Sequence, residues 1–473
     1  MTTSKSFPKD LLKTLTQFDQ THLLQWWESL NEQQQDELTS QIQSIDFAQI
    51  QRLYSPAHSS KTEESPAQKA ERANCAANII RLQDRLKPAM DTAQAVQAGK
   101  QLLAEGKVGA ILVAGGQGSR LGFQHPKGMY PTGPVKQTSL FQMLVEQLIA
   151  RSRIAGKPIC YFIMTSDATH DETVAYFKQH QNFGLQTDQL HFFKQGTMPA
   201  IDTQSGKILL EDKHRIAVSP DGHGGTLKAL KKSGLFEVMQ EKGIEHLYYH
   251  QVDNPTAIVC DPEFLGHHLQ HRAEVSVKVV SKRTPDEKMG IVCDVDNKTQ
   301  IIEYSDLPKH ISEQTDQTGN LLHWAGSTAI HIFNRSFLEQ IASDDELLPF
   351  HQANKKVPFI DSTGTQISPT EPNAIKFERF IFDVLPVSET VLVYEIDRQR
   401  EFNPLKNAEG PDSPQTVHTA LCRIYSQWFN SCGFEIPPGT AVEISPLIAL
   451  DESELKTKIS LDMNLNGPIY LGE

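Results

Sequence analysis

Hydrophobic residues recur at helical spacing through the first fifty residues of the chain. One group is Leu11, Leu15 and Phe18, and similar groups follow at residues 23–30, 38–45 and 47–53. Spacings of three and four place such residues on one side of a helix, so the pattern predicts a series of short amphipathic helices. The following segment, 55–69, contains Ser-Pro twice and mixed charge, which predicts a loop or linker.

From residue 108 the pattern changes to short apolar, β-branched runs that alternate with helical stretches. It predicts strands at 108–114, 159–164, 190–193, 247–252, 275–280, 328–333 and 391–396, and helices at 140–150 and 171–180. Strands that alternate with helices indicate βαβ units and an α/β fold with a doubly wound, largely parallel sheet. Ligands of such sheets bind beyond the carboxyl ends of the strands.

The end of the chain has a different pattern, with a predicted helix around 416–429 followed by short strand-like pieces. We therefore expect three parts: a helical N-terminal arm over 1–100, an α/β domain over 101–400, and a small C-terminal module over 401–473.

Charge and cysteine content narrow the classes of function. The 473 residues include 45 Lys+Arg and 58 Asp+Glu, a formal net charge of −13, which argues against nucleic-acid binding. Any anionic ligand must then be held by a local cluster of cations. The six cysteines are scattered without a Cys-x-x-Cys pair, which indicates a reducing compartment. With no signal-peptide pattern and no apolar run of about 18 residues, we expect a cytoplasmic protein without membrane contact.

A glycine-rich loop follows the first predicted strand, with the sequence LVAGGQGSRLG over 112–122 and Pro-Lys-Gly over 126–128. Glycines let backbone N–H groups approach a phosphate, and nearby cations add charge. The candidate phosphate-binding residues are Gly115, Gly116, Gly118, Arg120 and Lys127. The next glycine, Gly122, comes one residue too late for the dinucleotide-binding G-x-G-x-x-G, and no Gly-Lys-Ser/Thr of a P-loop follows.

This loop resembles the signature of the UDP-sugar pyrophosphorylases, and most closely that of the UDP-N-acetylglucosamine pyrophosphorylase branch. Further similar motifs occur in the same order and with similar spacing. They are IMTS at 163–166, FFKQG at 192–196, PDGHGG at 220–225, VDN at 252–254, EYS at 303–305, Ala-Gly at 325–326, IKFE at 375–378 and PLKNA at 404–408.

The resemblance implies a uridylyltransferase of the nucleotide-diphospho-sugar transferase fold, which joins UTP and a sugar 1-phosphate to give a UDP-sugar and pyrophosphate. The sugar phosphate attacks the α-phosphorus in line with the leaving pyrophosphate, so positioned cations matter more than a protein nucleophile. By resemblance, Arg120 and Lys127 lie at the nucleotide phosphates, Lys376 lies on the nucleotide side and Lys406 on the sugar-phosphate side.

Asp253 is the candidate metal ligand. It lies just past the predicted strand 247–252, where a carboxylate can hold a hard cation that bridges phosphates, and the resemblance implies Mg²⁺ there. The structural alternative is an Asp that caps a turn before Pro255.

The resemblance also implies the residues that recognise the base and the sugar. Gln195 and Gly222 are the candidates for the uracil ring, and Gly290 and Glu303 for the sugar. Two further positions on the sugar side are His223 and Ser327, which depart from the family's pattern. The N-acetylglucosamine enzymes have Asn at both positions, whereas Gly-His-Gly is familiar from UDP-glucose enzymes.

Three functions therefore remain open. The leading one is transfer of uridylyl to N-acetylglucosamine 1-phosphate or a related sugar 1-phosphate, and the nearest alternative is a UDP-glucose or broad UDP-sugar pyrophosphorylase. The alternative of another class is a non-catalytic sugar-nucleotide sensor, which should lack the phosphate-binding cations that this chain has.

The histidines at 267, 268 and 271 resemble a metal cluster at first sight. Their helical spacing, without a cysteine or carboxylate partner, instead predicts an exposed helix face and no metal site.

Overall fold

The computed structural model describes residues 7–54, 65–87, 90–344, 346–459 and 467–472. The chain divides into two compact units. Unit 1 comprises Met1–Ser65, Gln195–Thr226 and Leu348–Ile381, and unit 2 comprises Pro66–Lys194, Leu227–Leu347 and Phe382–Glu473. Each unit is therefore built from three stretches of chain. The division at residues 100 and 400 stays a prediction.

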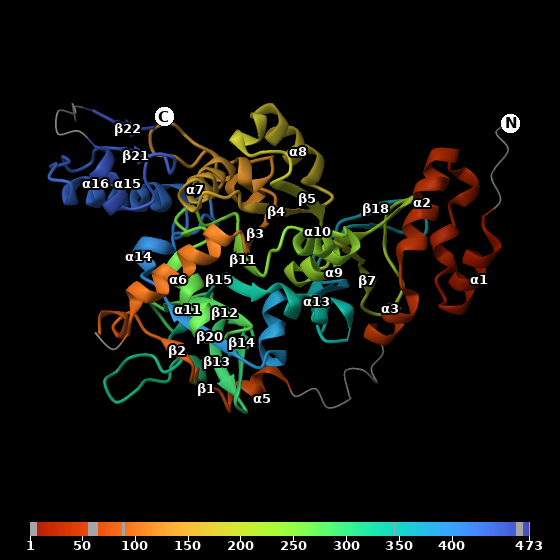
Figure 1. Ribbon diagram of the computed structural model, residues 1–473. Coiled ribbons are helices and arrows are strands. Elements are labelled where there is room, and N and C mark those ends of the chain that lie inside the picture. The colour runs from red at the N-terminus through yellow and green to blue at the C-terminus, as the bar shows by residue number, and fades with distance from the viewer. Residues whose placement is uncertain (1–6, 55–64, 88–89, 345, 460–466, 473) are drawn as a thin grey trace. The chain divides into compact units, whose positions relative to one another are not determined.

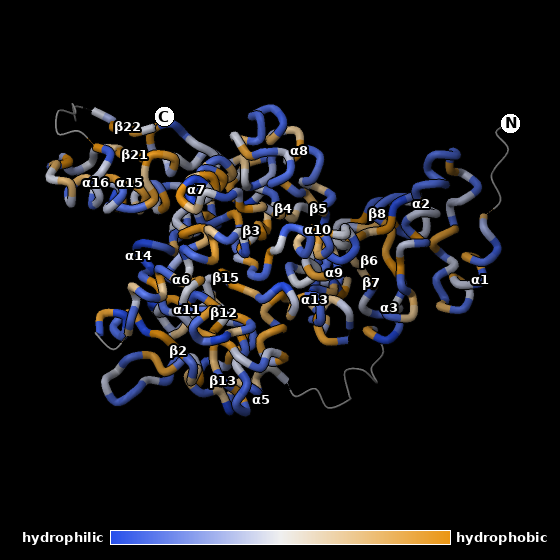
Figure 2. Tube along the Cα trace, viewed as in Figure 1, coloured by the Kyte–Doolittle hydropathy of each residue, from blue (hydrophilic) through white to orange (hydrophobic). Residues whose placement is uncertain are grey.

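The first stretch of unit 1 is helical, as the spacing of its apolar residues predicts. Its helices are α1 (Lys9–Gln17), α2 (Glu32–Ser44) and α3 (Phe47–Tyr54), with the 3₁₀ turns η1 (Thr21–Leu24) and η2 (Trp27–Ser29) between them. Figure 2 shows hydrophobic and hydrophilic positions alternating along α1 and α2. Asn31 caps α2, because its side chain accepts from the Gln34 N–H while the Gln34 side chain accepts from the Asn31 N–H.

These helices bury their apolar side against the second stretch of unit 1. Leu38 and Ile42 of α2 share one core with Ile208 and Ile216, and Gln20 accepts a hydrogen bond from the Ile208 N–H at 2.9 Å. The 195–226 and 348–381 stretches meet in a small sheet. Its strand order is β16 (His351–Lys355), β19 (Ala374–Glu378), β7 (Ile201–Asp202).

Unit 2 contains the large sheet, in the order β2-β20-β12-β15-β11-β3-β4-β5. The strands are β2 (Ile79–Ile80), β20 (Val391–Glu395), β12 (Val275–Ser281), β15 (Ala325–Asn334), β11 (His246–Gln251), β3 (Val108–Val113), β4 (Cys160–Thr165) and β5 (Leu190–Lys194). Neighbouring strands are parallel except at β15, which runs antiparallel to both β11 and β12. The predicted α/β fold with a largely parallel sheet is thus confirmed.

A smaller antiparallel group extends this sheet beside β15. It consists of β13 (Ile291–Val295), which pairs with β15, with β14 (Lys298–Ile302) and with β1 (Asn74–Cys75).

The predicted helices at 140–150 and 171–180 are α7 (Leu140–Ala155) and α8 (His170–Gln179). The predicted C-terminal helix is α15 (Pro414–Ser431), and the parallel strands β21 (Val442–Ile444) and β22 (Ile469–Leu471) follow it. The predicted loop at 55–69 is wrong at its end, because α5 (Pro66–Ala70) is helical, while residues 55–64 lie outside the described part. In the part of the chain that the structure describes, no helix is both long and apolar enough to cross a membrane.

Two helices of unit 2 pack unusually closely, α6 (Thr92–Glu105) and α11 (Pro262–Gln270) (Figure 1). A Cβ at Gly99 would lie 1.8 Å from the Pro262 carbonyl oxygen, and one at Gly266 would lie 1.7 Å from that of Ala95. Only glycine allows this approach of the two backbones.

The close packing of α11 corrects the prediction for its histidines. His267 and His268 are 0% and 1% exposed, so an exposed face is wrong for both. Instead, His268 contacts Ser276 Oγ through Nδ1 at 2.7 Å and Asn334 Oδ1 through Nε2 at 3.0 Å. Burial lowers the pKa of His268 to about 3. Its hydrogen bonds therefore tie a neutral ring into the core.

Candidate active site

The glycine-rich loop begins directly after β3 and folds back on itself. The Gly116 carbonyl accepts from the Lys127 N–H at 3.0 Å, and the Gly118 N–H donates to the His125 carbonyl at 2.9 Å. A Cβ at Gly118 would lie 2.8 Å from Phe123, so this glycine serves packing. Gly116 is exposed, and a Cβ there would meet nothing within 4 Å. Its backbone therefore faces open space where a ligand can approach.

Residues after β4 hold the loop in place. Ser166 Oγ donates to the Gly115 carbonyl at 2.8 Å, and Gln117 Nε2 donates to the Ala168 carbonyl at 2.9 Å. Ser166 ends one of the motifs in the sequence, but the sequence alone suggested no role for it. The structure makes it a support of the loop.

The loop and Asp253 lie at the same edge of the sheet. Strands β3 and β11 are parallel neighbours, with Val113 opposite Gln251, so the glycine loop and Asp253 both follow carboxyl ends of adjacent strands. Lys127 begins the turn η5 (Lys127–Met129), and its Nζ lies 3.9 Å from Asp253 Oδ2. Both side chains are mostly buried, at 17% and 16% exposure.

Two further cations belong to this group. Burial lowers the pKa of Lys127 and Asp253 opposes that effect, while Lys406 and Arg120 lower the pKa further. Asp253, Lys406 and Arg120 therefore each lie close enough to Lys127 to change the stability of its charge. Three cations and one carboxylate leave an excess of positive charge, which suits a multiply charged anion such as a polyphosphate. We call Arg120, Lys127, Asp253 and Lys406 the cation cluster.

Hydrogen bonds join the two chain segments that supply Asp253 and Lys406. The Leu405 N–H donates to the Asp253 carbonyl at 2.7 Å. Asn254 Nδ2 donates to the Glu401 carbonyl at 2.7 Å, and its Oδ1 accepts from the Asn403 N–H at 3.2 Å. The segment that leads to Lys406 is therefore held next to Asp253 by the Asp253 carbonyl and the Asn254 side chain.

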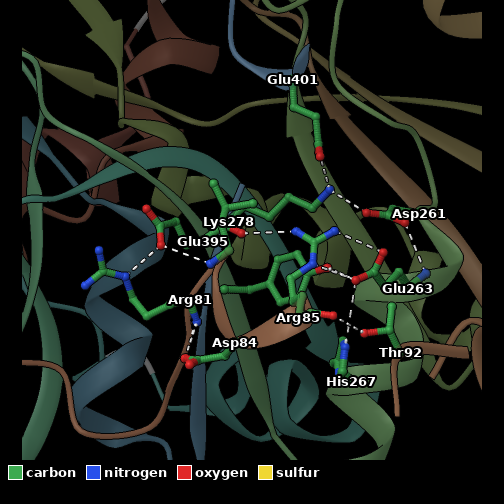
Figure 3. A network of polar contacts seen from close by, with 12 residues as sticks. Arg81, Asp84, Arg85, Thr92, Asp261, Glu263, His267, Lys278, Glu395 and Glu401 are labelled. Atoms are coloured by element: carbon green, nitrogen blue, oxygen red, sulfur yellow. Dashed lines mark hydrogen bonds and ion pairs between the residues drawn. The ribbon is translucent and has the colours of Figure 1, made fainter. Parts of the chain in front are cut away.

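A buried charge network, which the sequence analysis missed, supports this junction (Figure 3). Lys278 is fully buried in β12 and donates to Asp261 and to Glu401, each at 2.7 Å. Burial opposes the charge on Lys278, but the two carboxylates outweigh it and raise the pKa of the lysine. The signal was present in the sequence, because a lysine in the middle of the apolar run VSVKVV needs a buried partner.

Three of the predicted sugar-side residues lie together in unit 2. The Ser327 N–H donates to the Gly290 carbonyl at 2.8 Å. A Cβ at Gly290 would lie 3.0 Å from Glu303 Oε1 and 2.8 Å from Ile301 Cγ2, so the glycine is required for the approach of the Glu303 side chain. The β13, β14 and β15 strands thus bring Gly290, Glu303 and Ser327 into one group.

The other predicted site residues belong to unit 1. Gln195 Nε2 donates to the Gly222 carbonyl at 2.6 Å. Gly222 has a φ of +81°, and a Cβ there would lie 2.3 Å from the Arg379 carbonyl oxygen, so glycine is required twice over. Lys376 lies in β19 opposite Ala353, and within the described ranges its side chain forms no hydrogen bond or ion pair.

His223 is half-buried beside these residues. Its Nδ1 accepts from the Ile381 N–H at 3.1 Å, and its ring lies against that of Phe380 with centroids 5.4 Å apart. Burial lowers its pKa to about 4, with a smaller effect of His351 in the same direction. The ring is therefore neutral near pH 7, with Nε2 as the protonated nitrogen.

A largely parallel α/β sheet with a cluster of cations at the carboxyl ends of its strands is typical of proteins that bind nucleotides. A protein-family model described as UTP–glucose-1-phosphate uridylyltransferase matches residues 47–463. The chain belongs to this family of uridylyltransferases.

Individual relatives agree with this assignment. UDP-N-acetylglucosamine pyrophosphorylase of Saccharomyces cerevisiae is 35% identical over 449 residues, which cover 90% of this chain and 92% of that protein. UDP-N-acetylglucosamine diphosphorylase 2 of Arabidopsis thaliana is 33% identical over 92% of this chain and 89% of its own length. The crystal structure of the uridine diphosphate N-acetylglucosamine pyrophosphorylase from Trypanosoma brucei has a TM-score of 0.84 and 25% identity, and covers 99% of each chain. The family resemblance drawn from the motifs is confirmed.

Proposed function

We propose that the chain joins UTP and N-acetylglucosamine 1-phosphate to give UDP-N-acetylglucosamine and pyrophosphate. The observation that supports this most directly is the cation cluster beside the exposed backbone of Gly116. The names of the relatives in yeast, plant and trypanosome support the choice of sugar.

The roles of the cations follow from the charge that the reaction develops. An oxygen of the sugar phosphate forms a bond to the α-phosphorus of UTP while the bond to pyrophosphate breaks, so no protein nucleophile is needed. We assign Arg120 and Lys127, with the N–H groups of Gly115 and Gly116, to the UTP phosphates, and Lys376 to the nucleotide. The N–H of Gly118, predicted to join them, instead donates to the His125 carbonyl within the loop. Lys406 takes the sugar phosphate. Preorganised cations of this kind stabilise charge that grows in the transition state.

Asp253 fits the requirements of Mg²⁺. This ion is commonly held by one or two carboxylates together with substrate phosphates, and Asp253 is the single carboxylate of the cation cluster. When bound, Mg²⁺ would neutralise charge on the triphosphate. The 3.9 Å contact with Lys127 keeps this carboxylate beside the phosphates that it would share with the ion.

We assign the base and the sugar to the remaining groups. The amide nitrogen of Gln195 is engaged by Gly222, which leaves its oxygen to accept from the uracil N–H. Glu303 would accept from sugar hydroxyls and the N–H of Gly290 would donate to one, with Ser327 beside them in unit 2. His223 of unit 1 is assigned to sugar choice by its departure from the family's motif.

One assay separates the possible activities: release of pyrophosphate from UTP with a panel of sugar 1-phosphates. We expect the highest kcat/KM with N-acetylglucosamine 1-phosphate. Activity confined to glucose 1-phosphate would favour the alternative that His223 and Ser327 suggest. Binding of UDP-sugar without any pyrophosphate release would indicate a sensor.

We further propose that the protein works in the cytoplasm. All six cysteines are free, and Cys160, Cys260 and Cys293 are buried thiols. Such thiols are typical of a reducing compartment.

A further inference from the structure

A pocket lies in unit 2 beside residues 255–258, which follow Asp253 in the chain. Helix α7, residues 255–258, helix α15 and residues 444–450 enclose it, with an empty volume of about 560 Å³ that includes its opening to solvent. Most of its wall is apolar or aromatic. Representative residues are Ile258, Leu421, Ile424, Tyr425 and Trp428.

Arg151 of α7 lines this pocket and is the unusual feature of its wall. The residue is 9% exposed, and its Nε is buried without a hydrogen-bond partner. Within the part of the chain that the structure describes, its guanidinium forms no hydrogen bond or ion pair. A buried N–H donor without a partner is costly, so the Nε of Arg151 and the positive charge of its guanidinium favour an anion at this place.

The other charged residue of the lining is also an arginine. Arg400, from α14 (Arg398–Glu401), also lines the pocket, and none of the lining residues is an Asp or a Glu. The nearby carboxylate of Asp261 feels the charge of Arg151, but it is already bound to Lys278. An incoming anion would therefore find two guanidinium groups and no competing acid in the wall.

We propose that this pocket binds an amphipathic anion, a phosphate ester or carboxylate attached to an apolar or aromatic group. Its charged end binds Arg151 and Arg400, and its apolar end packs against Trp428 and Leu421. None of the pocket's lining residues belongs to the cation cluster, so the two sites are separate.

The test uses the full chain and phenyl phosphate as the probe, with inorganic phosphate and phenol as the two halves of that probe. Binding is measured by calorimetry. We expect phenyl phosphate to bind at least about tenfold more tightly than either half, because the pocket offers both charge and apolar surface. Failure of phenyl phosphate to bind, or binding no tighter than that of inorganic phosphate, would overturn the proposal.

Variants identify which site takes the probe. Arg151→Met should weaken the binding of phenyl phosphate about tenfold or more, whereas Arg153→Met, an exposed arginine on the same helix, should not. Arg400→Met, at an exposed position, supplies a second variant and should also weaken binding. Lys127→Ala should leave this binding unchanged. If Lys127→Ala abolishes it while Arg151→Met and Arg400→Met do not, the probe occupies the cation cluster and the proposal is wrong.

Discussion

The buried network around Lys278 allows a quantitative prediction of stability (Figure 3). Lys278→Met preserves much of the side-chain volume but removes the ammonium group that two carboxylates share. The carboxylates of Asp261 and Glu401 each lie 2.7 Å from Nζ, so they are no more than twice that distance apart, and both are nearly buried. Removing one partner of a buried ion pair costs about 3–5 kcal/mol, because the remaining charges stay buried and unpaired. We expect this loss in the free energy of unfolding at neutral pH.

The dependence on pH distinguishes this cause from simple loss of packing. In the wild type, burial raises the pKa of Asp261, but Lys278, together with smaller effects of Arg151 and Arg85, outweighs burial and the net shift is downward. A lowered carboxylate pKa contributes stability above the unfolded-state pKa, and that contribution is lost as the pH falls. In Lys278→Met only the smaller effects of Arg151 and Arg85 still oppose burial, so the pKa of Asp261 rises and its protonation relieves the variant as the pH falls. The difference between the two proteins should therefore shrink in acid.

Urea unfolding followed by fluorescence measures both effects. The matched control is Lys309→Met, since Lys309 is 85% exposed and pairs only with Glu313 at 3.6 Å on the surface; it should leave the free energy of unfolding nearly unchanged. The triple variant Lys278→Met/Asp261→Asn/Glu401→Gln should recover most of the loss, because it removes all three charges of this buried group together. A Lys278→Met protein that unfolds like the wild type at neutral pH would refute the reasoning.

Three further predictions concern catalysis, sugar choice and acid stability. Lys127→Ala should lower kcat for pyrophosphate release by about 10², the usual cost of one preorganised electrostatic group, and an unchanged kcat would show that the lysine is a bystander. His223→Asn should shift the ratio of kcat/KM toward N-acetylhexosamine phosphates over glucose 1-phosphate, and an unchanged ratio would exclude this position from sugar choice. Burial lowers the pKa of His250 and His268 to about 3, so the unfolded chain takes up protons first as the pH falls. Each of these two histidines should therefore lower the free energy of unfolding by about 1.4 kcal/mol at pH 5.5 relative to pH 7.5. Urea midpoints that stay level between these two pH values would contradict this prediction.

The apolar runs of the sequence predicted the strands of the large sheet because a strand buried on both faces has a local signature. The run at 108–114 and the run at 247–252 each lie within one residue of the strands observed, β3 and β11. Ligands bind at the carboxyl ends of such strands, and the glycine loop and Asp253 each follow a carboxyl end. The two segments lie at the same edge of the sheet because β3 and β11 are parallel neighbours.

Arrangements that depend on distant contacts left no such signature. Strand β15 inserts between β11 and β12 against their direction, and nothing in the local pattern of residues 325–334 encodes that direction. The assembly of unit 1 from three stretches of chain also has no local signature in the sequence. Leu38 and Ile216 meet in one core although 178 positions of the chain separate them, and helical spacing shows only that Leu38 needs some apolar partner.

Charged residues inside apolar segments indicate buried partners or ligands even in the sequence alone. Lys278 in VSVKVV led to the network that supports Glu401, and Arg151 lies in a helix whose other residues are mostly apolar. A residue of that kind must be paired, exposed or bound to a ligand. The structure shows Lys278 paired, and Arg151 neither paired nor exposed.

The negative charge of the whole chain is compatible with its anionic substrates because electrostatic interactions in salt are local. At physiological ionic strength the field of an exposed charge decays over about 8 Å, so the acidic surface beyond that distance contributes little at the cation cluster. Within the cluster, the lowered pKa of Lys127 shows that burial and two neighbouring cations already disfavour its charge, with only Asp253 in opposition. A bound triphosphate would relieve that destabilisation. Relief of the repulsion among Arg120, Lys127 and Lys406 in the free protein therefore contributes favourably to the binding of the triphosphate. A strongly basic chain is not required for this.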